Sequence, residues 1–122
     1  MTRSSVMIVD DDAELRELMA MVVTARGFDT MEAADGIDAM EQLEGGAEPS
    51  LILLDLRMPR MNGTEFLDAL RHGSHVPQVP VLVITGDPCA AQGALEAGAC
   101  GCLRKPIEAK VLLDAIRQAL RD

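Results

Sequence analysis

Acidic and other polar side chains stand at the ends of the apolar runs in this 122-residue sequence. If these runs are parallel strands, their carboxyl ends meet at one edge of the sheet, where open α/β proteins bind their ligands. The side chains would then form one site that combines several carboxylates, one hydroxyl and one ammonium group. They are Asp10, Asp11 and Asp12 after the first run, Asp55 after Leu54, Thr85 after Ile84, and Lys105 after the last run.

Such a set of side chains has a defined chemistry. Carboxylates crowded into one site repel each other by about 4 kcal/mol at close range and intermediate dielectric, so they must take up protons or a cation. Oxygen ligands of this kind favour Mg²⁺, which also accepts phosphate oxygens, and the ammonium and hydroxyl groups suit a phosphoryl group. Because the sequence lacks both G-x-x-x-x-G-K-[ST] and G-x-G-x-x-G, we expect a phosphodonor rather than a bound nucleotide. A carboxylate can accept the phosphoryl group as an acyl phosphate.

Taken singly, these residues have plainer interpretations. Asp11 or Asp12 can cap the helix that follows, because aspartate is a favoured N-cap residue. Thr85 can be a turn residue, and Lys105 a solvated charge. Asp55 is harder to explain in this way, since it interrupts a strongly apolar run and a buried carboxylate without a partner is costly.

The elements that would position these residues alternate along the chain. Short, almost continuous apolar runs are typical of strands that are buried on both faces of a parallel sheet. Such strands are predicted at 6–9, 28–33, 51–54, 79–84 and 100–103.

Between the strands, apolar residues recur at helical spacing. Five β-α units with right-handed crossovers predict an α/β fold, in which five helices cover a doubly wound, five-stranded parallel sheet. We expect one domain over 1–122. The expected helix signals are a first helix closed by Gly27, a second ended by Gly45 and Gly46, a third capped by Thr64, and a fourth and fifth with Pro88 and Pro106 in their first turns.

Composition excludes several classes of function. Twenty acidic against eleven basic residues give a formal net charge of -9, which makes direct binding of nucleic acid or an anionic membrane unexpected. No apolar run is long enough to span a bilayer, and the amino terminus does not resemble a signal peptide. We therefore expect a cytoplasmic protein, with its three cysteines as buried, reduced thiols.

The sequence resembles the receiver domain of bacterial response regulators over essentially its whole length. The resemblance is carried by V-D-D-D, L-L-D-L-R-M-P-R-M-N-G, V-I-T-G and L-R-K-P, which occur in the order and at the distances of that family. It implies a flavodoxin-like (CheY-like) sheet with strand order 2-1-3-4-5. It also implies a part in two-component signalling, in which phosphorylation switches protein–protein interactions.

The resemblance assigns roles to the acidic residues. Asp55 would be the phosphoacceptor and would take the phosphoryl group from a sensor histidine kinase or a phosphotransfer protein. Asp10 and Asp11 would hold Mg²⁺ together with Asp55, and the backbone carbonyl of Arg57 would complete the protein ligands. Asp12 falls outside the acidic pair of the family and is left as a helix cap.

The resemblance also covers the last two motifs. Thr85 would turn its hydroxyl toward the phosphoryl group, and Lys105 would pair with a phosphoryl oxygen. The peptide bond between Lys105 and Pro106 would be cis. The domain would assist its own phosphorylation and dephosphorylation rather than act as an enzyme. One position departs from the family, because Cys102 replaces the Tyr or Phe whose ring usually moves on activation.

Other functions fit the residues less well or extend beyond them. The chain could be the receiver half of a longer DNA-binding transcriptional regulator, or act alone on a downstream protein, as a monomer or a phosphorylation-dependent homodimer. A phosphohydrolase of the haloacid dehalogenase-like type would need a second acid where Arg57 stands. A flavin-binding electron carrier would need a hydroxyl- and glycine-rich loop after the first strand, where aspartates would repel its phosphate.

Overall fold

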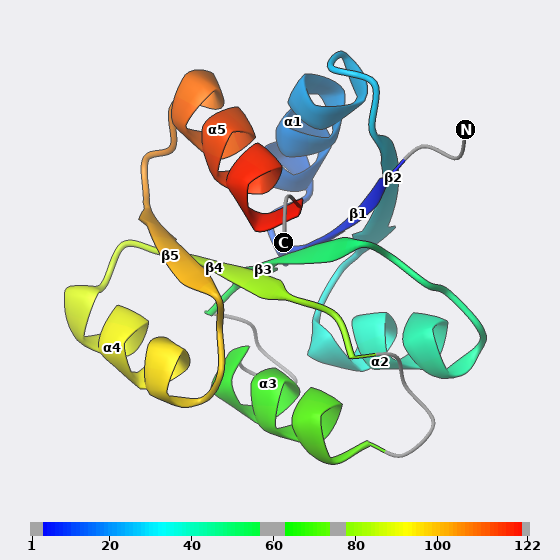
Figure 1. The fold of residues 1–122 in the computed structure, drawn as a ribbon, viewed down its shortest axis with the longest axis vertical. Helices are drawn as coiled ribbons and strands as arrows, with labels where there is room; N and C mark the ends of the chain where they lie inside the picture. Colours follow the sequence, from blue (N-terminus) through cyan, green and yellow to red (C-terminus); the bar gives the residue numbers. More distant parts are fainter. Residues whose placement is uncertain (1–3, 57–62, 74–77, 121–122) are drawn as a thin grey trace.

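Five parallel strands form the sheet in the part of the chain that the computed structural model describes, namely residues 4–56, 63–73 and 78–120 (Figure 1). The strand order is β2-β1-β3-β4-β5, so the predicted topology is confirmed. A helix follows each strand, as expected for parallel strands joined by crossovers. The strands are β1 (Ser5–Val9), β2 (Asp29–Ala33), β3 (Leu51–Asp55), β4 (Val81–Thr85) and β5 (Gly101–Arg104).

Helices cover both faces of the sheet. Helices α1 and α5 lie on one face, and α2, α3 and α4 lie on the other (Figure 1). Among the described residues, no helix has the length and apolar character needed to cross a bilayer. The helices are α1 (Ala13–Thr24), α2 (Gly36–Glu44), α3 (Gly63–His72), α4 (Pro88–Glu96) and α5 (Ala109–Leu120).

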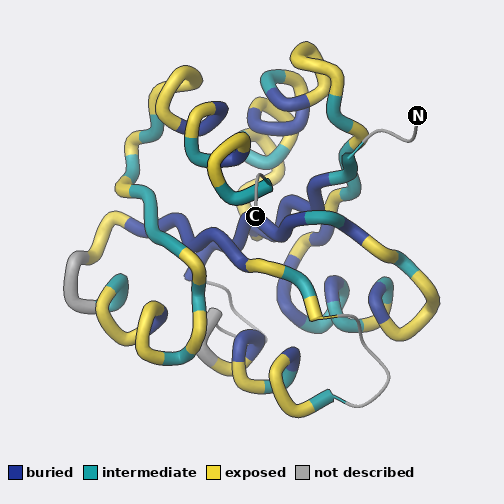
Figure 2. The backbone as a smooth tube through the Cα atoms, in the orientation of Figure 1, coloured by how far each residue is buried: buried dark blue, intermediate teal, exposed yellow. Residues whose placement is uncertain are grey.

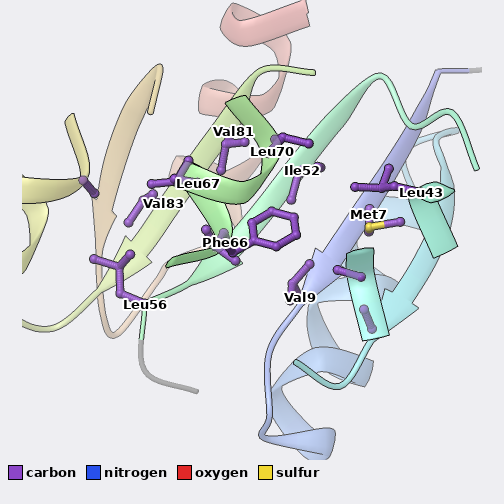
Figure 3. Packing of buried hydrophobic residues seen from close by; sticks show 14 residues of the cluster. Met7, Val9, Leu43, Ile52, Leu56, Phe66, Leu67, Leu70, Val81 and Val83 are labelled. Atoms are coloured by element: carbon purple, nitrogen blue, oxygen red, sulfur yellow. The ribbon is translucent and has the colours of Figure 1, made fainter. Parts of the chain in front are cut away.

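The core has two layers because the central strands are buried on both faces (Figure 2). Alternate residues of β1 separate these layers: Ile8 packs with α1 and α5, whereas Met7 packs with α2 and α3. Phe66 from α3 is fully buried within the second layer (Figure 3). The continuous apolar runs therefore arise because both faces of each central strand need apolar partners.

Two predicted helix starts are wrong. Helix α3 already includes Gly63, so Thr64 lies within the helix and not at its cap. Helix α5 begins at Ala109 rather than at Pro106. The reason is that the Lys105 N–H still donates to the Thr85 carbonyl at 3.1 Å, so the chain continues beside β4 and must turn before it becomes helical. Pro88 does begin α4, as predicted.

Candidate functional site

The register of the sheet brings the predicted residues to one level. Val9 pairs with Leu54, so Asp10, the next residue of its chain, lies at the level of Asp55. Asp55 is the last residue of the central strand β3 and is 5% exposed. Thr85 is the last residue of β4 and is also buried. The carboxyl ends of three adjacent strands therefore present these side chains together.

Three carboxylates form an acidic group at this edge. Asp10, Asp11 and Asp55 each offer an oxygen, and these oxygens all lie within 4.8 Å of one another. Asp10 and Asp55 are buried, whereas Asp11 is exposed. Oxygen donors at this separation have the chemistry that hard divalent cations require.

Asp10 shows most clearly what this group lacks. Its Oδ2 atom is buried and, within the described part of the chain, makes no hydrogen bond. The pKa of the Asp10 carboxyl is raised from its ordinary value of 3.8 to about 6, chiefly by burial. The hydrogen bond from the Asp12 N–H acts in the opposite direction and lowers this pKa. The value of about 6 also includes the neighbouring charge of Asp55, which raises this pKa, and that of Lys105, which lowers it. A cation between the carboxylates would supply the missing partner, so the acidic group fits a divalent metal ion.

Lys105 places a positive charge beside the acidic group. Its Nζ lies 3.4 Å from Oδ1 of Asp55 and 3.9 Å from Oδ2 of Asp10. Its own backbone holds it there, because the N–H donates to the Thr85 carbonyl at the end of β4. Within the part of the chain that the structure describes, one ammonium group faces three carboxylates, and this excess of negative charge again favours a divalent cation.

A polar cavity of about 340 Å³ opens beside Asp55. Thr85 lies on its wall, and the Thr85 hydroxyl accepts a hydrogen bond from the backbone N–H of Asp87 at 3.1 Å. Lys105 lines the same cavity. A group that enters it therefore meets two acidic residues, a hydroxyl and an ammonium group. The lining residues are Asp55, Thr85, Gly86, Asp87 and Lys105.

Asp12, the third consecutive aspartate, caps a helix and is not part of the acidic group. Asp12 is the N-cap of α1, and its Oδ1 accepts the N–H groups of Glu14 and Leu15 at 3.1 and 3.2 Å. The Asp12 N–H in turn donates to Oδ1 of Asp10 at 2.9 Å. The expectation that Asp12 is a helix cap is confirmed, and the alternative of Asp11 in that position is wrong.

The family model named response regulator receiver domain matches residues 6–117 of this sequence. The chain belongs to this family. It is therefore a receiver domain, a phosphoacceptor module of two-component signalling, with an acidic pocket formed by Asp10, Asp11 and Asp55.

Relatives of this receiver domain differ in length. A transcriptional regulatory protein CpxR homolog of Haemophilus influenzae is 38% identical over 118 residues, which are 97% of this chain and 51% of the relative. The chain thus spans about half the length of the first curated relatives it matches. Chemotaxis protein CheY1 of Helicobacter pylori is 29% identical, over 93% of this chain and 94% of its own.

Solved structures are also similar to this receiver domain. The chemotaxis protein CheY4 of Vibrio cholerae has a TM-score of 0.89 and 30% identity, and the comparison covers 98% of this chain and 100% of that one. A putative response regulator from Chloroflexus aurantiacus has a TM-score of 0.92 and 28% identity, over 99% and 100% of the two chains.

The structure of the receiver domain brings together most of the residues that the sequence singled out. The acidic group and Lys105 are in direct contact, and Thr85 borders the same cavity. The Lys105–Pro106 peptide bond is cis, as predicted. Arg57, whose carbonyl was predicted as a metal ligand, lies outside the described residues.

Sequence reasoning missed two residues near the receiver pocket. Asp87 lines the cavity, and the strand-end argument could have found it two residues after Thr85. Arg16 is the second, since its Nη1 donates to the backbone carbonyl of Asp10 at 2.8 Å. No sequence signal identifies Arg16, because its target is a main-chain atom.

The cysteines of the receiver domain only partly match the expectation of buried thiols. Cys100 is exposed and immediately precedes the edge strand β5, and Cys102 is half-buried on the α4 side of β5. Partial burial raises the pKa of both thiols above its ordinary value. The side chain of Cys89 lies outside the described residues.

Proposed function

We propose that this receiver domain accepts a phosphoryl group on Asp55 from the phosphohistidine of a sensor histidine kinase or a phosphotransfer protein. The observation that carries this proposal is the pairing of Asp55 with Lys105 across 3.4 Å at the mouth of an open polar cavity. Membership of the family supports it, because receiver domains are phosphoacceptors in two-component signalling.

The proposed step is a transfer between two nucleophiles. An oxygen of the Asp55 carboxylate forms a new bond to phosphorus while the bond from phosphorus to the histidine nitrogen breaks. The nitrogen leaves with the electron pair, and the product is an acyl phosphate on Asp55. Water can later attack the same phosphorus, so that the bond from phosphorus to the Asp55 oxygen breaks, inorganic phosphate leaves and the carboxylate is restored. The same side chains would assist both the phosphorylation and the dephosphorylation of the domain.

Lys105 and Thr85 would stabilise the transferred group. The Lys105 ammonium already lies beside the Asp55 carboxylate and can donate to a phosphoryl oxygen without a large movement. The Thr85 hydroxyl borders the same cavity and can donate a hydrogen bond from the end of the adjacent strand β4. Both groups are held by strand ends before transfer begins, so little reorganisation is needed.

We propose Mg²⁺ as the cation of the acidic group. Asp10, Asp11 and Asp55 would hold it, and the Arg57 carbonyl is proposed as a further ligand. When bound, Mg²⁺ supplies positive charge that offsets the negative charge of the transferring phosphoryl group. Its other benefit is to the protein, since it relieves the repulsion around the buried Asp10 carboxylate.

The output of the domain is proposed on the basis of its relatives. Residues 1–122 would form one receiver domain that acts on a separate protein target or on a fused output domain, as a monomer or as a phosphorylation-dependent homodimer. The half-length match to the CpxR homolog, which is named a transcriptional regulatory protein, supports a fused DNA-binding output. The full-length match to the chemotaxis protein CheY1 supports a separate target.

Intact-mass measurement after incubation with Mg²⁺ and a small acyl phosphate tests the proposal. We expect the parent chain to gain one phosphoryl group and Asp55→Asn to gain none. Asp12→Asn is the matched control, because it removes one neighbouring charge while asparagine still caps α1. If Asp55→Asn is phosphorylated as readily as the control, the assignment of the acceptor is wrong.

A further inference from the structure

Arg16 connects three elements behind the acidic group. It lies in the second turn of α1, and its side chain is only 18% exposed. Its Nη1 donates to the backbone carbonyl of Asp10 at 2.8 Å, and its Nε donates to Oε1 of Glu32 in β2 at 3.1 Å. One guanidinium group therefore links α1, β2 and the segment that follows β1.

The Asp10 carbonyl, which Arg16 contacts, influences the positions of both Asp10 and Asp11. β1 ends at Val9, and the Asp10 N–H continues the sheet pattern by donating to the Ala33 carbonyl at 3.2 Å. The Asp10 carbonyl belongs to the peptide unit that joins Asp10 to Asp11. Because a peptide unit is planar, a bond to its oxygen orients the Cα atoms of both residues at once. A single charge-assisted hydrogen bond thus constrains two of the three carboxylates.

We propose that Arg16 is a positioning residue for the cation site, and that Glu32 holds its guanidinium group in place. This inference rests on the proposed function, since it concerns the same three carboxylates. Arg16 does not face the cation or the phosphoryl group; it acts through the backbone of Asp10. Glu32 accepts a hydrogen bond from the Arg16 Nε–H, which restrains the planar guanidinium group beside the Asp10 carbonyl.

Positioning and simple electrostatics predict opposite outcomes when Arg16 is replaced. A positive charge near the acidic group repels a cation, so its loss should tighten Mg²⁺ binding if charge were its only contribution. If Arg16 positions the carboxylates, its loss should weaken Mg²⁺ binding instead. Groups that orient metal ligands typically change affinity by about 10- to 100-fold when they are mutated.

Isothermal titration of the purified chain with MgCl₂ tests the proposal. We expect Arg16→Gln to weaken Mg²⁺ binding by about tenfold. Arg16→Lys keeps the charge, but its single ammonium group cannot reproduce the two directed bonds, so binding should also weaken. Arg117→Gln is the matched control, because it makes the same charge change at an exposed ion pair on α5 and should bind as the parent does.

Phosphorylation kinetics separate positioning from a general loss of structure. In Arg16→Gln, the Mg²⁺ concentration for half-maximal phosphorylation should rise about tenfold, while the rate at saturating Mg²⁺ recovers most of the parent value. Unchanged or tighter Mg²⁺ binding by Arg16→Gln overturns the inference and leaves the proposed function intact. If Arg16→Gln does not fold, the Mg²⁺ affinity of Arg16→Lys decides between the two outcomes. A parent chain that binds no Mg²⁺ overturns both.

Discussion

At the scale of single residues, the buried carboxylate of Asp10 lowers the stability of the fold but suits the binding of a cation. Its carboxylate is buried beside two other acids, and one of its oxygens accepts no hydrogen bond among the described residues. An apolar residue or an amide would suit an empty pocket better. An aspartate at this position is explained if it is a metal ligand, because a bound cation offsets the cost of burying its charge. This makes Asp10 a sensitive test of the site through stability alone.

The first test is the pH dependence of unfolding in metal-free buffer. The folded-state pKa of Asp10 is raised to about 6 from 3.8, so between these values the folded chain keeps a proton that the unfolded chain has lost. Stability should therefore fall as pH rises through this window, and above it the cost should be constant. Asp10→Asn should abolish this contribution and be more stable than the parent at pH 7.5, by up to about 3 kcal/mol.

Urea denaturation of both proteins at pH 4 and pH 7.5 measures the effect. Asp12→Asn serves as a control with the same change in charge and an intact helix cap. The stability gain of Asp10→Asn should be large at pH 7.5 and small at pH 4. An equal gain at the two pH values would show that burial of the charge is not the cause.

Mg²⁺ should stabilise the parent chain but not a variant that lacks most of the acidic group. A ligand that binds only the folded state stabilises it by RT ln(1 + [L]/Kd), so millimolar MgCl₂ should raise the melting temperature of the parent chain. The double variant Asp10→Ala/Asp11→Ala has lost two of the three carboxylates and should not respond. In metal-free buffer the double variant should be at least as stable as the parent, because it lacks the repulsion between the carboxylates. A parent that melts at the same temperature with and without Mg²⁺ contradicts the cation site.

At the scale of elements, the carboxyl ends of the strands were predictable from the sequence, whereas the starts of two helices, α3 and α5, were not. Strongly apolar runs leave few choices for a buried strand, and parallel strands must bring Asp55 and Thr85 to the same edge. The start of α5 depends instead on the Lys105 N–H, which pairs with a neighbouring strand, so the local pattern at Pro106 misleads. Arg16 could not be found from the sequence for a related reason: it recognises a main-chain carbonyl.

The start of α1 offers a test at the same scale. Asp12 satisfies two N–H groups in the first turn, which would otherwise lack partners. Asp12→Ala should lower the free energy of unfolding by about 1 kcal/mol, and Asp12→Asn should lower it little, because asparagine caps as well as aspartate. Urea denaturation checks both. Equal losses would indicate that the charge at the helix end, rather than the hydrogen bonds, provides the stabilisation.

At the scale of the whole molecule, the two groups proposed to contact the phosphoryl group bracket one segment of the chain. Thr85 ends β4 and Lys105 follows β5, and α4 lies between them in sequence. A phosphoryl group that draws these two residues toward Asp55 would therefore act on β4, α4 and β5 together. Cys102 lies within this segment and packs on the α4 side of β5, but its side chain is too small to exchange a large volume between two positions.

The conformational response should accordingly depend on Thr85 and not on Cys102. A ligand shifts an equilibrium only by its different interactions with the two states, and the Thr85 hydroxyl can make such an interaction. Backbone amide spectra recorded with and without beryllofluoride, a phosphoryl mimic, should show large shifts in β4, α4 and β5. These shifts should persist in Cys102→Ala and in Thr85→Ser, which keeps the hydroxyl, and shrink in Thr85→Ala, while phosphorylation of Asp55 continues. Shifts confined to the pocket in the parent chain, or lost in Cys102→Ala, would show that the response follows another route.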